Sequence, residues 1–174
     1  MASVNTEILD AITGRALDLQ RLTATQLRDS ARFLRTLEGD IVAQLARIDP
    51  TGIAAPSRQA ARLEKLLAQN CETIRGAYRA ESTRLLGELR ELADIETRFA
   101  ASSINRAVGA ELIATSVTRG QLAALVDGVL IQGAPVSDWL SRQAGDTLQR
   151  FTDTMRLGIA EGETNASLIR RTTC

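Results

Sequence analysis

The chain has 174 residues, of which 44% are hydrophobic and only 3% aromatic, and its 21 basic side chains balance its 21 acidic ones. Histidine is absent, which removes the commonest general base and the most common metal ligand. A balanced charge argues against a protein that binds nucleic acid by neutralising phosphates, and the scarcity of aromatic residues favours a core of Leu, Ile and Ala between closely packed helices.

The first predicted element is one long helix over residues 4–48. No proline interrupts this stretch, and apolar residues return in steps of three and four. Four of them, spaced by seven, are Leu27, Leu34, Ile41 and Ile48. The turn-forming stretch Asp49–Gly52, followed by Pro56, ends the helix because proline cannot continue it.

The second predicted helix covers residues 57–99. A heptad-like row of apolar residues runs along it: Cys71, Tyr78, Leu85, Leu92 and Phe99. Two helices of similar length joined by a short loop should fold back on each other, so residues 1–100 are predicted to form a long antiparallel hairpin. We predict that this row and the row on the first helix form its helix-packing seam.

Shorter helices are predicted after the hairpin. Residues 101–117 form a connector or weak helix, and 118–174 form a short-helix region. In that region Thr118 caps a helix from residue 119 to about 131, and a further helix runs from 137 or 138 to about 161. Gly162 ends that helix, and Thr164 or Asn165 caps a final turn. No alternating pattern predicts a strand, so the fold class is all-α.

Carboxylates and nucleophilic side chains are the residues that could support catalysis or metal binding. Glu81 and Glu88 lie two turns apart on one predicted helix face, but di-iron bundles need Glu-x-x-His pairs. Solvent-side ion pairs with Arg84, together with an Asp94–Arg98 pair, explain these carboxylates more simply. No nucleophile elbow or phosphate-binding loop is present, and Cys71 is expected to be a small core residue. We therefore predict no catalytic residue, no cofactor and no metal site, and a protein that is not an enzyme.

The segment from Met155 to Arg171 allows three interpretations. A helix-turn-helix is disfavoured, because the helix after the glycines is too short to carry several base-reading side chains. Asn165-Ala-Ser167 spells a glycosylation sequon, but the N-terminus shows no secretory signal. The favoured interpretation is a hinge between two packing helices. No run approaches the ~20 apolar residues that span a bilayer, so stable membrane insertion is not expected.

The region from Gly133 to Arg171 resembles the minor head, or head-morphogenesis, proteins of tailed bacteriophages. Members share a Gly, an apolar residue and Trp-Leu, then a long amphipathic helix, a glycine turn with Thr or Ser, an apolar pair and Arg-Arg. The matching positions here are Gly133, Val136, Trp139, Leu140, Arg156, Gly158, Ile159, Gly162, Thr164, Leu168, Ile169, Arg170 and Arg171. The stretch Leu63–Ala68 is also similar to a segment of the family's helical leader.

This resemblance implies a low-copy virion protein at the portal vertex or inner capsid, made in the host cytoplasm, that assists head assembly and genome packaging. Its expected partners are portal or capsid subunits and further copies of itself, without sequence-specific nucleic acid. Family members usually continue into a compact C-terminal domain, whereas this sequence ends at Cys174. An ejection protein released with the DNA, and a cytoplasmic coiled-coil adaptor, are the alternatives.

Overall fold

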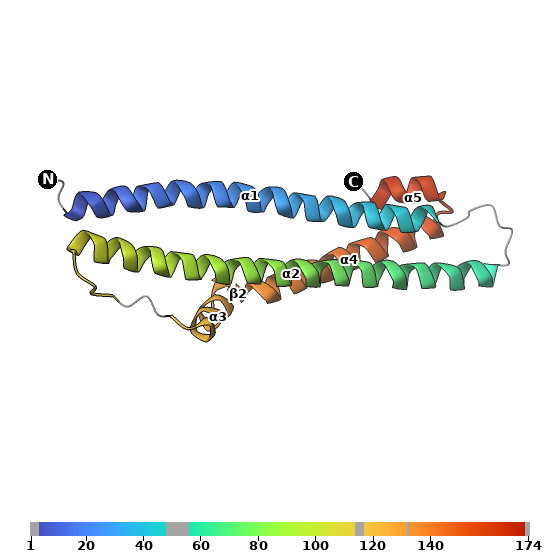
Figure 1. Ribbon diagram of the computed structural model, residues 1–174. Coiled ribbons are helices and arrows are strands. Elements are labelled where there is room, and N and C mark those ends of the chain that lie inside the picture. The colour runs from blue at the N-terminus through green and yellow to red at the C-terminus, as the bar shows by residue number, and fades with distance from the viewer. Residues whose placement is uncertain (1–3, 48–55, 114–116, 132, 173–174) are drawn as a thin grey trace. The chain divides into compact units, whose positions relative to one another are not determined.

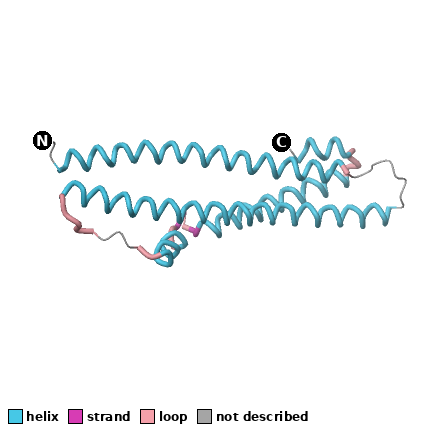
Figure 2. The backbone as a smooth tube through the Cα atoms, viewed as in Figure 1, coloured by secondary structure: helices cyan, strands magenta, loops and turns pink. Residues whose placement is uncertain are grey.

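A computed structural model describes residues 4–47, 56–113, 117–131 and 133–172. Helices dominate these residues (Figures 1 and 2), and α1 and α2 pack together as an antiparallel hairpin, which confirms the all-α prediction. The described elements are α1 (Val4–Ala46), α2 (Pro56–Val108), α3 (Arg119–Asp127), β1 (Leu130–Ile131), β2 (Ala134–Pro135), α4 (Val136–Ala160) and α5 (Asn165–Thr172).

The structure places two boundaries more exactly than the sequence did. In the segment 101–117, predicted as a connector or weak helix, α2 continues to Val108. It ends at Gly109, whose positive φ of 71° is a backbone conformation that favours glycine. The Asn105 side chain holds this end, accepting from the backbone N–H groups of Leu112 and Ile113 at 2.9 and 3.0 Å.

The helix after Thr118 is shorter than predicted. α3 stops at Asp127, and the N-cap predicted at Thr118 is present as part of a capping box whose second member is Gln121. Leu130 and Ile131 instead pair with Ala134 and Pro135 in a small antiparallel ladder. This ladder was missed because each strand has only two residues, too few to show an alternating pattern.

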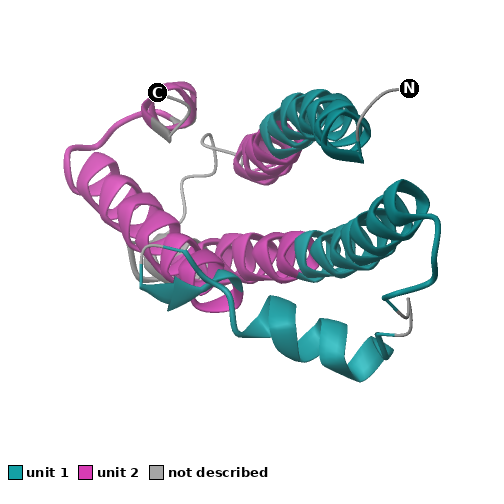
Figure 3. Ribbon diagram, turned by 90° about the vertical axis from the view of Figure 1, so that its left-hand side faces the viewer, with its two compact units in different colours: residues 1–31, 83–136 teal, residues 32–82, 137–174 magenta. Residues whose placement is uncertain are grey.

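By their contacts, the residues divide into two compact units, shown in different colours in Figure 3. Unit 1 comprises residues 1–31 and 83–136, and unit 2 comprises 32–82 and 137–174. Both α1 and α2 contribute to each unit. This division therefore differs from the predicted one into 1–100, 101–117 and 118–174.

Unit 1 pairs the first part of α1 with the second part of α2. Arg15 donates from Nε to Glu96 Oε1 at 2.7 Å, and its guanidinium lies 5.7 Å from the centroid of the Phe99 ring. Further along α1, Gln26 accepts from Arg84 at 3.4 Å, which fixes the antiparallel direction. The buried side chains of this unit are Ala101, Leu122, Val126, Ala134 and Val136, all outside α1.

Unit 2 holds a hydrophobic core to which α1, α2, α4 and α5 all contribute. Phe33 and Tyr78 meet edge to face with ring centroids 5.3 Å apart, and Gln44 donates to Thr73 at 2.8 Å. Tyr78 also exchanges a hydrogen bond with Thr147 of α4 at 3.0 Å. The buried cluster consists of Leu37, Leu45, Leu67, Ile74, Tyr78, Phe151, Met155 and Leu168.

Candidate functional site

The predicted helix-packing seam is only partly buried. On α2, Tyr78 is buried, while Cys71, Leu85, Leu92 and Phe99 are half-buried. On α1, Ile41 is half-buried, but Leu27 and Leu34 are 68% and 52% exposed, so the prediction that they lie inside the hairpin is wrong. Ile48 lies outside the described residues.

The error follows from what surrounds each part of α1. The residues of α1 that pack inward in unit 2 are spaced by four: Phe33, Leu37, Ile41 and Leu45. Leu34 lines an open groove together with Leu37 and Ile41. Leu27 belongs to unit 1, where none of the residues of α1 from Val4 to Ala31 is buried.

The α1 helix carries a second apolar surface, to which Leu27 of the predicted seam also belongs. Every residue from Val4 to Ala31 is described, and none of them is buried. One exposed row of uncharged residues there returns at steps of three, four and seven, and we call it the apolar α1 face: Leu9, Ile12, Ala16, Thr23 and Leu27. The signal available in the sequence was the absence of charge at these positions. Such a surface suits packing against another helix.

A groove in unit 2 is the larger of two hollows described in that unit. Its volume is about 500 Å³, and residues of α1, α2, α4 and α5 line it. Its floor is apolar, from residues including Leu37, Ile74 and Phe151, and its charged residues are Glu38, Arg150 and Arg171. An apolar side chain flanked by polar groups would fit such a lining.

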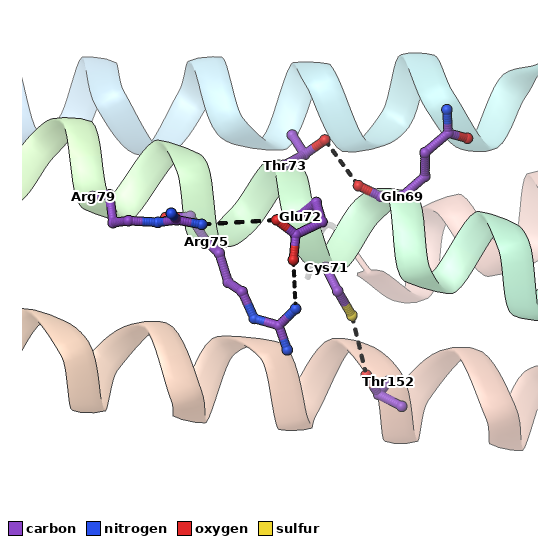
Figure 4. Close-up of polar contacts among 7 residues, drawn as sticks. All are labelled: Gln69, Cys71, Glu72, Thr73, Arg75, Arg79 and Thr152. Carbon is purple, nitrogen blue, oxygen red and sulfur yellow. Dashed lines mark hydrogen bonds and ion pairs between the residues drawn. The ribbon is translucent and has the colours of Figure 1, made fainter.

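The second hollow, of about 390 Å³, lies between α2 and α4 and includes Arg75 and Arg79. Both arginines are engaged by Glu72, at 2.7 and 3.7 Å (Figure 4). On the same helix Cys71 is half-buried rather than fully buried, and its Sγ lies 3.9 Å from Thr152 Oγ1 of α4. These contacts are those of ordinary helix packing with solvated ion pairs.

The chain turns between α4 and α5 as predicted, but Gly158 and Gly162 have different structural roles. Gly162, with a φ of 71°, ends α4: Glu163 N–H donates to Gly158 O at 2.9 Å and Gly162 N–H to Ile159 O at 3.0 Å. This is a Schellman motif. The Thr164 hydroxyl then accepts from Ser167 N–H at 3.3 Å and caps α5.

Gly158 lies inside α4, not in the turn. It is needed because α5 approaches closely: a Cβ at this position would overlap the Leu168 side chain and meet the Glu163 carboxylate. Arg171 ties the two helices together by ion pairs with Glu161 at 2.9 Å and Glu163 at 3.3 Å. Gly158, Gly162, Thr164, Leu168 and Arg171 thus form one packing unit.

The other residues of the family-like pattern have different environments. Gly133 adopts a φ of 81° beside the small ladder, and Leu140 is buried. Trp139 is exposed, as are Arg156 and Arg170.

Glu81 corrects the prediction of solvent-side carboxylates. It is only 6% exposed, whereas the predicted pairs Arg84–Glu88 and Asp94–Arg98 are present at 2.7 and 2.6 Å with half-buried carboxylates. Asn70 is fully buried as well, and its Nδ2 donates to Leu66 O at 3.0 Å. Polar side chains therefore lie inside the helical packing at positions where the sequence suggested either solvent or apolar contact.

Within the part of the chain that the structure describes, no three His, Cys, Asp or Glu side chains gather as metal ligands would. No helix among the described residues is long and apolar enough to cross a bilayer. Comparison with protein-family models, with curated proteins and with solved structures found no match.

Proposed function

We propose that this chain is a structural protein of a tailed-bacteriophage virion, a minor head protein at the portal or inner capsid that assists head assembly and genome packaging. One observation carries the proposal: between Val4 and Ala31, α1 exposes large apolar side chains and has no buried residue. Complete burial of one leucine contributes about 1.5–3 kcal/mol. Helices of this kind gain stability by packing against other proteins.

The resemblance supplies the identity of the assembly. The glycine-turn pattern that supports it is used structurally here, because Gly158 admits Leu168 and Gly162 turns the chain toward α5. A glycine turn that serves helix packing is what the family resemblance would require of this segment. The proposal places the chain's partners among portal or capsid subunits.

Mass spectrometry of purified particles tests this proposal. We expect the chain in washed virions at a low copy number relative to the major capsid protein. A second measurement, on particles that have released their DNA, separates a retained head protein from an ejected one. Absence from purified particles at the detection limit set by a known minor protein would refute both virion roles and leave the cytoplasmic adaptor.

A further inference from the structure

We propose that the apolar α1 face is a self-association surface, on which a second copy of this chain packs its own α1 in the antiparallel direction. Its exposed leucines suit another apolar helix, and the evidence that selects a second copy is the order of apolar and charged residues along the face. This inference does not depend on the proposed function, since self-association can occur with or without a virion.

The apolar residues at the two ends of the face match under a two-fold axis. Leu9 and Leu27 are eighteen residues apart, which is five full turns of an α-helix, so they lie on the same side of α1. An antiparallel copy centred on Asp18 places Leu9 beside Leu27 of the second copy, and Leu27 beside its Leu9.

The charges beside these leucines select the direction. Asp10 follows Leu9, and Arg28 follows Leu27, so both charges lie on the same edge of the face. Antiparallel packing sets Asp10 beside Arg28 of the other copy, twice per dimer. In a parallel pair the two edges that carry these charges lie on opposite sides of the interface, so neither charge would meet an opposite charge of the other copy.

Both charged side chains are accessible for this pairing. Asp10 and Arg28 are exposed, and Arg28 donates hydrogen bonds to Ala24 O and Thr25 Oγ1 on its own helix, each at 3.2 Å. A guanidinium has five N–H donors, more than these two contacts use. Two hairpins joined through α1 form a four-helix arrangement, the usual way in which such hairpins complete their packing.

The first test measures the mass of the full-length chain in solution as a function of concentration, by light scattering and sedimentation. We expect the mass of two chains, and the mass of one chain for Leu27→Asp. Leu157→Asp is the matched control, because Leu157 is 52% exposed on α4 and should leave the dimer intact. Circular dichroism of both variants checks that they stay helical.

The second test exchanges the charges. Asp10→Arg or Arg28→Asp alone should weaken the dimer roughly tenfold, because each creates two like-charge contacts. The double variant restores opposite charges and should recover most of the affinity. Another protein partner would have no reason to respond to this compensation.

Three outcomes overturn the inference: a single-chain mass at every concentration, a dimer unaffected by Leu27→Asp, or a double variant no stronger than the single ones. If the chain is monomeric in solution but present in purified virions, self-association is refuted and the proposed function stands. A portal or capsid subunit would then cover the apolar α1 face. A dimer absent from virions would refute the function alone.

Discussion

Unit 1 and unit 2 are built from the same two long helices, yet they bury their side chains very differently. In unit 2, α4 and α5 join α1 and α2, and Leu37, Ile74 and Met155 become buried. In unit 1, α1 pairs with α2 without burying one of its residues from Val4 to Ala31. The number of helices that surround a segment, more than its own hydrophobicity, therefore decides how stable that segment is.

Substitution in the core of unit 2 should change the free energy of unfolding most. Ile74 is 0% exposed, so Ile74→Ala should lower the free energy of unfolding by about 2–5 kcal/mol. Its matched control on the same helix is Ile95→Ala in unit 1, where the side chain is 50% exposed and the cost should stay below about 1 kcal/mol. Urea unfolding of both variants measures the difference. Equal costs would show that the two units are packed alike.

The contact between α4 and α5 gives the next largest effect. Gly158→Ala should cost about 1–3 kcal/mol, because the new Cβ overlaps Leu168. Gly145→Ala on the same helix meets nothing within 4 Å and should stabilise by about 0.5–1 kcal/mol. Thermal unfolding measures both. A Gly158→Ala variant as stable as Gly145→Ala would mean that α5 does not pack on α4.

In unit 1 the strongest single contact expected is that of Arg15. Arg15→Ala should cost about 1 kcal/mol, because it removes the pair with Glu96 and the stacking on Phe99. Arg15→Lys keeps the charge but loses the planar guanidinium, so we expect an intermediate value. Hydrogen exchange of the α1 amides near Arg15 reads the local effect. No change in exchange there would contradict the pairing of these helices.

The smallest effect should come from a surface ion pair. Arg98→Ala removes the i,i+4 contact with Asp94 and should cost only about 0.3–0.5 kcal/mol. Salt screens such pairs, so the cost should fall further when the urea titration is repeated at about 1 M NaCl. A loss above about 1 kcal/mol would indicate that Arg98 makes a contact beyond this pair.

Sequence periodicity predicted the fold because its main signals are local. Steps of three and four define α1 and α2 without any knowledge of their neighbours, and Pro56 stands at the start of α2. Gly162 and Thr164 were likewise predictable as the end of α4 and the cap of α5, since both residue types satisfy backbone groups at helix ends.

The burial of particular faces could not be predicted, because it depends on which other helix is nearby. Leu27 and Leu37 are equally apolar, but only Leu37 meets the core. Glu81 is charged and nevertheless buried. The close approach that requires Gly158 involves Leu168, and nothing in the local sequence of either residue reports the distance between them.

The antiparallel pairing of α1 and α2 also sets an order for folding. Gln44 and Thr73 are 29 residues apart along the chain, whereas Arg15 and Glu96 are 81 apart, and the entropy lost on closing a loop grows with its length. The Gln44–Thr73 contact, with the shorter separation, should therefore form first. Contacts of larger separation should then form one after another toward the start of α1 and the end of α2. Pulsed hydrogen exchange during refolding would detect this order as earlier protection around Gln44 than around Arg15.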